Sequence, residues 1–209
     1  MRVQLLDAER KVEEAQKQKE KIVEELRSAG AYRGLLFEKG KPLENVIIEA
    51  LRLLGFRAAP FKESDSEFDV VFESDEGRLI GEAEGKDNKA VNIDKLRQLS
   101  MNIHEDLQRE SVTAPAKPVL FGNGFRLQPL NVRADPFTEK CHNASATSST
   151  ALVFTPDLFW PVQYLVSNPD AEYARACRQT LLSATGRIVF PPPPIEEETR
   201  DETEVGKEK

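Results

Sequence analysis

The stretch Phe68-Asp-Val-Val-Phe-Glu-Ser-Asp-Glu-Gly-Arg-Leu-Ile-Gly-Glu-Ala-Glu-Gly-Lys86 decides how the rest of the chain is interpreted. Two apolar-rich runs flank the segment 74–77, Ser-Asp-Glu-Gly, which is a signal for a β-hairpin. Because residues two apart on a strand project from the same face, Glu82, Glu84 and Lys86 share one face of the second strand. Lone buried charges are unfavourable, so this face is either exposed to water or holds a ligand.

A divalent metal ion is the ligand that best fits these side chains. Mg²⁺ prefers oxygen ligands, typically one or two carboxylates together with water and phosphate oxygens. Asp69 on the first run and Glu84 on the second supply carboxylates, and the Gly85 carbonyl adds a third oxygen. Lys86 then lies beside the metal, where its ammonium group orients a water and offsets developing negative charge. The alternative is a solvent-facing hairpin with weak surface ion pairs such as Glu82–Lys86.

The arrangement resembles the PD-(D/E)xK nuclease superfamily, which has the restriction-endonuclease-like fold. Members carry an acidic residue near the start of a helix, an Asp on the second strand and Glu-x-Lys on the third. This chain has Glu44 in the segment 40–44 that opens a helix, then Asp69, then the segment 84–86, Glu-Gly-Lys. The resemblance covers about residues 38–125.

The resemblance implies an α/β fold with a mixed central sheet flanked by helices. It also implies an active site in which Asp69, Glu84 and the Gly85 carbonyl bind Mg²⁺ or Mn²⁺. In such a site Lys86 assists the attacking water, and Glu44 completes the acidic cluster.

The helix that follows the Glu-x-Lys motif contributes further candidates. Apolar residues at helical spacing predict a long amphipathic helix over 93–110. In some branches of the superfamily a Gln or Lys on this helix lines the active site. Gln98 and Lys95 are therefore candidates, with surface positions as the alternative.

The chain is long enough for one domain with appendages, since it has 209 residues. We expect a nuclease-like α/β domain over residues 31–190, preceded by an N-terminal helix or short coiled coil over 1–30. Residues 191–209 begin with four prolines and are rich in acids. Such a segment cannot build a core, so we expect a disordered acidic tail.

Residues 2–29 contain no Gly or Pro, which predicts one continuous helix. Apolar and small residues recur in it at heptad spacing, with a lysine at one position. One series is Leu5, Val12, Lys19 and Leu26, and the other is Ala8, Ala15 and Ile22. Two interpretations stay open: a coiled coil that makes a homodimer through residues 2–29, or a single solvated helix that packs one stripe on the domain.

Composition limits the partners. The net charge of −7 argues against a strong non-specific nucleic-acid binder, which usually shows a basic surface. No apolar run approaches the ~20 residues needed to span a bilayer, and the charged N-terminus is unlike a signal peptide. We therefore expect no membrane partner and a cytoplasmic location. The two cysteines, Cys141 and Cys177, make neither a disulfide framework nor a zinc site.

Two functions from different classes remain open. The first is a Mg²⁺-dependent endonuclease, a hydrolase that binds DNA and cleaves its phosphodiester bonds. The second is a catalytically inactive nuclease-fold module for interaction or regulation that oligomerises through its N-terminal helix. The intact set of acids and lysine favours the first function, and the acidic charge balance favours the second.

Overall fold

The computed structural model describes residues 2–63 and 66–194, without the side chains of 2–6, 24–29, 62–63 and 66–67. The acidic tail from 195 onward lies outside the described residues. The side chains of Leu5 and Leu26 in the heptad series lie outside them too.

A six-stranded mixed sheet organises the described residues. The strands are β1 (Arg57–Glu63), β2 (Ser66–Ser74), β3 (Gly77–Gly85), β4 (Lys117–Asn123), β5 (Ala151–Phe154) and β6 (Gly186–Arg187), and they lie side by side in this order. The pairs β1–β2 and β2–β3 are antiparallel, whereas β3 to β6 are parallel. The predicted hairpin is therefore present, and the mixed α/β class is confirmed.

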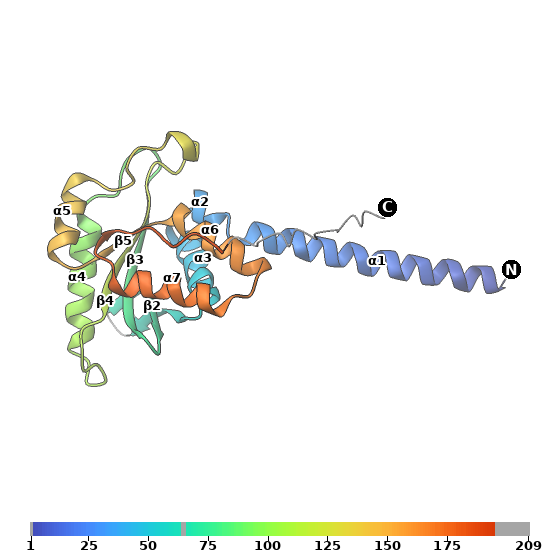
Figure 1. The fold of residues 1–209 in the computed structure, drawn as a ribbon, viewed down its shortest axis with the longest axis horizontal. Helices are drawn as coiled ribbons and strands as arrows, with labels where there is room; N and C mark the ends of the chain where they lie inside the picture. The colour runs from blue at the N-terminus through green and yellow to red at the C-terminus, as the bar shows by residue number, and fades with distance from the viewer. Residues whose placement is uncertain (1, 64–65, 195–209) are drawn as a thin grey trace, which may run out of the picture.

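Helices cover both faces of this sheet (Figure 1). They are α1 (Arg2–Ala31), α2 (Gly34–Phe37), α3 (Gly40–Leu53), α4 (Asp94–Leu107), α5 (Glu139–Thr147), α6 (Thr155–Ser167) and α7 (Ala171–Ser183), with a 3₁₀ turn at Leu130–Val132. None of the helices in the described ranges is both long and apolar enough to cross a membrane.

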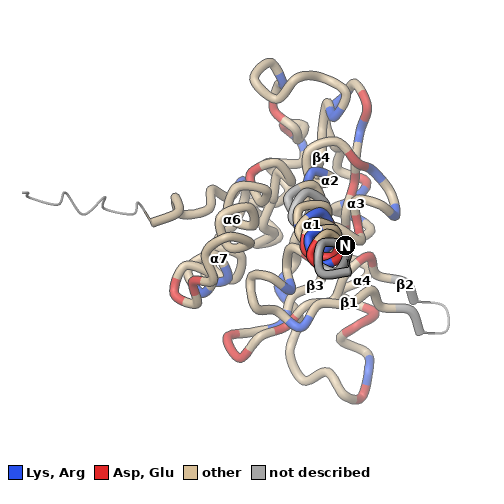
Figure 2. Tube along the Cα trace, turned by 90° about the vertical axis from the view of Figure 1, so that its right-hand side faces the viewer, with Lys and Arg blue, Asp and Glu red and all other residues tan. Residues whose placement is uncertain are grey.

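The first helix stands apart from the domain. Figure 1 shows α1 extending from one side of the molecule, and Figure 2 views it end-on. Residues 8–23 of α1 are all exposed. The interpretation in which this helix packs a stripe on its own domain is therefore wrong for that segment.

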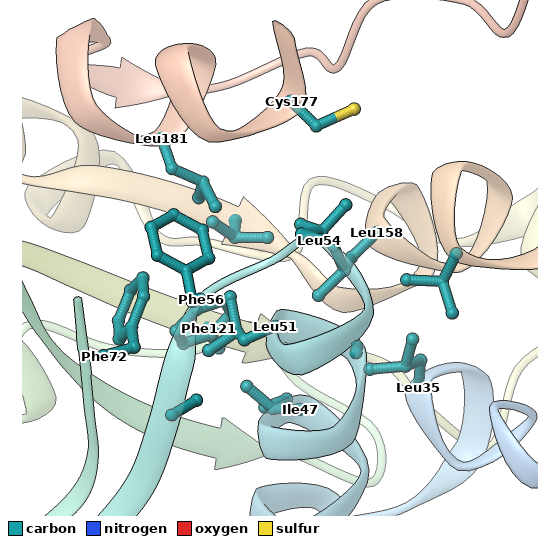
Figure 3. Packing of buried hydrophobic residues seen from close by; sticks show 14 of the residues in the cluster. Leu35, Ile47, Leu51, Leu54, Phe56, Phe72, Phe121, Leu158, Cys177 and Leu181 are labelled. Carbon is teal, nitrogen blue, oxygen red and sulfur yellow. The ribbon is translucent and has the colours of Figure 1, made fainter. Parts of the chain in front are cut away.

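The larger core lies between the sheet and the helices α3, α6 and α7. Figure 3 shows the rings of Phe56, just before β1, Phe72 of β2 and Phe121 of β4 beside aliphatic side chains from the helices. The apolar stripe of α3 is buried here: Val46, Ile47, Ala50, Leu51 and, just past the helix end, Leu54. Burial of this stripe holds α3 on one face of the sheet.

The second core lies on the opposite face, under α4 and α5. Its members include Ile80 from β3, Leu120 from β4 and Leu99 from α4. The helix α4 is also attached by charge, because the Arg78 guanidinium of β3 is paired with the fully buried carboxylate of Asp106. The apolar contacts and this ion pair together fix α4 against β3.

We predict that Asp106→Ala lowers the free energy of unfolding by roughly 3 kcal/mol, because it leaves the Arg78 guanidinium without its buried partner. Glu49→Ala is the matched control. It breaks an exposed pair with Arg52, which is expected to change stability by less than about 0.5 kcal/mol. Urea unfolding followed by circular dichroism measures both. Equal small effects would show that α4 does not depend on the ion pair.

Candidate active site

The candidate site lies where β3 ends and β2 begins. Because these strands are antiparallel, the start of β2 and the end of β3 lie at the same edge of the sheet. β3 and β4 are parallel, so the carboxyl end of β4 lies at this edge as well. Asp69 and the segment 84–86 are thereby brought to one end of the sheet, as the sequence predicts.

A register irregularity accompanies Asp69. Ala59 pairs with Val71, but Phe61 pairs with Phe68, so two steps along β1 match three along β2. Asp69 lies within this extra step. A β-bulge of this kind bends the strand and re-aims a side chain.

The carboxylate of Asp69 points across to β3. Its Oδ2 accepts a hydrogen bond from the backbone N–H of Ala83 at 2.9 Å, and its carboxyl group lies within hydrogen-bond reach of Glu82. Two carboxyl groups therefore lie next to each other on neighbouring strands.

Glu82 is fully buried, so the solvent-facing alternative is wrong for this residue. Its Oε1 accepts a hydrogen bond from Asn102 Nδ2 at 2.6 Å. Its Oε2 accepts one from Lys95 Nζ at 3.0 Å. Both partners belong to α4, which covers this face of β3. The buried carboxylate is thus satisfied by a helix that follows it in the chain.

Burial shapes the ionisation of this cluster. Burial, and after it the charge of the adjacent Asp69, raise the pKa of Glu82 to about 7, although Lys95 opposes the shift. Burial alone lowers the pKa of Lys95, but the negative charges of Glu82, Asp69 and Glu84 outweigh it and raise the pKa above its ordinary value. The ammonium group of Lys95 is therefore held charged among three carboxyl groups.

Glu84 and Lys86 lie at the open side of the site. Lys86 Nζ contacts Glu84 Oε1 at 2.7 Å, and the two side chains are 27% and 20% exposed. Lys86 thus pairs with Glu84 and not with Glu82, which the sequence had offered as a surface pair. The reason is that α4 covers Glu82.

A depression of about 480 Å³ opens beside this pair, lined by Lys39 and the segment 84–89. Gly85 sits in its wall, and a Cβ at this position would lie 2.4 Å from the Cβ of Lys39. Lys39 in turn donates to Asp87 at 3.1 Å. The close approach at Gly85 therefore places the entry of α3 directly against the end of β3.

A network of partly buried hydrogen bonds lies beside the depression. The Arg133 guanidinium donates to Asn123 Oδ1 and to the carbonyls of Leu36 and Arg126. Arg126 donates to Asp87 Oδ1 at 2.7 Å. This last bond ties the loop after β4 to Asp87, which lines the depression.

Two further predicted site residues, Gln98 and Glu44, lie on opposite faces of the sheet. Gln98 is exposed and its Oε1 accepts a hydrogen bond from Lys95 Nζ at 3.1 Å, which places it beside the carboxylate cluster. Glu44 lies on α3, on the opposite face of the sheet from α4, and its Oε2 is paired with Lys41 at 2.7 Å. Within the described ranges, no three Asp, Glu, His or Cys side chains form a group that could hold a metal ion. The structure thus gathers Asp69, Glu84, Lys86 and Gln98, and it leaves Glu44 apart from them.

Sequence reasoning missed Asn102 and offered Lys86, not Asn102 and Lys95, as the partner of Glu82. A signal for both was present. Lys95, Asn102 and Asp106 recur at spacings of seven and four, so they lie on one stripe of α4, alongside the buried Leu99. Polar residues in line with an apolar stripe indicate buried polar partners across the interface.

Comparison with solved structures finds a similar fold in the restriction endonuclease FokI, with a TM-score of 0.47 and 12% sequence identity. The alignment covers 72% of this chain and 28% of the FokI chain, so the chain spans less than a third of that protein. At this identity and TM-score the likeness carries no argument about activity. No protein-family model matches the chain, and no curated protein matches it.

We predict that Glu82 makes stability fall as pH rises. Its folded pKa of about 7 lies above the ordinary value of 4.5. Its stabilising contribution is therefore complete below pH 4.5 and is lost as pH rises through about 7. Between pH 4.5 and 8 this amounts to roughly 3 kcal/mol.

The variant Glu82→Gln cannot titrate and should lack this loss, whereas the exposed Glu110→Gln control should keep it. Urea unfolding in metal-free buffer across pH 5 to 8 measures the slopes. Identical slopes for the wild type and Glu82→Gln would contradict the assignment.

Proposed function

We propose that residues 31–190 form a metal-dependent endonuclease domain that hydrolyses DNA phosphodiester bonds with Mg²⁺ or Mn²⁺. The observation that supports it is the meeting of Asp69, Glu84 and Lys86 at one end of the sheet, beside an open depression. The residues and their order are those that the resemblance implies for hydrolysis.

The donor set suits a hard divalent cation. The carboxylates of Asp69 and Glu84, with the Gly85 carbonyl, are oxygen donors of the kind that Mg²⁺ prefers. The ammonium group of Lys95 already occupies this field of negative charge, which supports an affinity of the cluster for cations. Glu84 is partly exposed at the depression, so an ion and a phosphate group have a route to it.

Each residue has a distinct role in this proposal. A bound divalent metal supplies Lewis acidity and a water of lowered pKa. Asp69 and Glu84 hold the ion, and the backbone N–H of Ala83 orients the Asp69 carboxylate. Lys86 lies at the rim, where its ammonium group orients the attacking water and offsets negative charge on the phosphate. Gln98 contributes a polar amide beside Lys95.

Glu44 keeps the role that the resemblance implies, the completion of the acidic cluster, as a prediction. Its carboxylate pairs with Lys41, so the role requires a change of rotamer toward the sheet end. The cytoplasmic location expected from the sequence also stays a prediction.

The charge at the depression is compatible with a phosphate backbone. Lys39, Lys86 and Lys89 line the depression together with Glu84 and Asp87. Elsewhere, lysines, arginines and acids are interspersed along the chain (Figure 2). Nucleic acid is therefore expected to bind through this depression, with weak binding elsewhere on the surface.

We predict that Mn²⁺ raises the melting temperature of the wild type by roughly 5 °C at about 100 times its Kd, because it binds only the folded site. Asp69→Asn should lose this shift. Asp75→Asn, in the fully exposed turn at the other end of the same hairpin, should keep it. A thermal melt by fluorescence with and without metal gives the answer, and an equal response of all three proteins would place the metal elsewhere.

We predict that Lys86→Ala lowers the rate of DNA cleavage by roughly 100-fold or more, because the charge that offsets the phosphate is lost. The fold should be retained, since Lys86 is partly exposed. Lys140→Ala, an exposed lysine on α5, is the control. Single-turnover assays on DNA and RNA substrates with Mg²⁺ measure the rates. Absence of cleavage by the wild type on every substrate would favour the inactive interaction module.

We also propose that α1 makes a homodimer through a coiled coil. The observation that favours it is the exposure of apolar side chains along a helix that stands apart, namely Val12 at 70% and Ile22 at 47%. A second copy would bury both. Val12→Glu with Ile22→Glu should convert a dimer to a monomer in light scattering and leave the melting of the domain unchanged. A wild-type monomer at all concentrations would contradict the dimer.

A further inference from the structure

Lys95 occupies an unusual position for a lysine. Its Nζ donates to Glu82 Oε2 at 3.0 Å and to Gln98 Oε1 at 3.1 Å. The Lys95 side chain is 23% exposed and its Glu82 partner is fully buried. The ammonium group therefore lies between a buried carboxylate and an exposed amide, on the solvent side of the cluster.

The same ammonium group also lies in the field of the two proposed metal ligands, Asp69 and Glu84. When Asp69, Glu82 and Glu84 are ionised, Lys95 and Lys86 leave the cluster with one net negative charge. A divalent cation added to this set would make it net positive. Like charges in a partly buried site repel, so a bound divalent cation opposes the presence of the Lys95 ammonium group in the same field.

We propose that Lys95 is the resident counter-cation of the carboxylate cluster and that a divalent metal ion displaces it. This inference rests on the proposed function. Lys95 and the metal compete for the same negative field, so Lys95 sets the affinity of the site for metal. It acts through the carboxylates and is thus a positioning residue.

The surroundings of Lys95 provide a route for this displacement. Gln98 lies one helical turn further along α4 and is exposed, so its amide oxygen can keep the ammonium group while the group moves outward. Asn102 Nδ2 still donates to Glu82 Oε1 after the change. The buried Glu82 therefore keeps a hydrogen-bond partner when Lys95 leaves it.

Lys95→Met is the test variant, because it removes the charge and retains most of the side-chain length. Lys89→Met is the matched control, since Lys89 is an exposed lysine that lines the same depression. Isothermal titration of each protein with Mn²⁺ alone, without nucleic acid, measures Kd. Asp69→Asn identifies the heat that belongs to the proposed site.

The expected result is that Lys95→Met binds Mn²⁺ about tenfold more tightly than the wild type, while Lys89→Met stays within about twofold. If Lys95→Met binds Mn²⁺ and the wild type does not, the result supports the inference most strongly. Wild-type binding that Asp69→Asn abolishes and Lys95→Met leaves equal or weaker would overturn the inference and leave the proposed function standing. No binding by any of these proteins would overturn both.

A second pair of variants covers the case in which Lys95→Met fails to fold around an unpaired Glu82. Glu82→Gln and the double variant Glu82→Gln with Lys95→Met both lack the buried negative charge. Their Asp69 and Glu84 carboxylates remain. The double variant is expected to bind Mn²⁺ more tightly than Glu82→Gln alone by a similar factor, and equal affinities would again overturn the inference.

Discussion

The buried carboxylate of Glu82 is the constraint on which the rest of the site depends. A charge with no access to water requires hydrogen-bond partners, and both oxygens of Glu82 find theirs on α4, in Asn102 and Lys95. The helix therefore has to lie over β3 in one register. A second charged contact, between Arg78 and Asp106, repeats the requirement further along the same strand and helix. The contacts that satisfy the buried carboxylates therefore also position the helix.

The contacts that hold α4 on the sheet also affect the charge of the candidate site. The side chains that dock α4 also neutralise the carboxylates at the end of the sheet, because Lys95 lies in the field of Asp69 and Glu84 as well as Glu82. A charged site of this kind would otherwise be destabilised by repulsion among its own acids. The fold places the ammonium group of Lys95 among these carboxyl groups, so the charge of the cluster and the position of α4 are electrostatically coupled.

The mixed strand directions explain why the site lies at one edge. Antiparallel pairing of β2 with β3 returns Asp69 to the end where β3 finishes, and parallel pairing of β3 with β4 brings Asn123 to the same end. The absence of a side chain at Gly85 lets Lys39 approach the strand end. Arg126 then ties the loop after β4 to Asp87, which lines the open depression.

Local patterns in the sequence determined the hairpin around residues 74–77, and with it the placement of Asp69 and Glu84 at one end of the sheet. They also determined the apolar stripe of α3, since strand alternation, helical spacing and turn residues act over a few positions. Only the tertiary structure decided that Glu82 is buried, that Asn102 and Lys95 satisfy it, and that Glu44 lies on the other face of the sheet. The physical reason is that burial depends on which helix covers a face. The partners of Glu82 lie 13 and 20 residues away, and no local period specifies a contact across that distance.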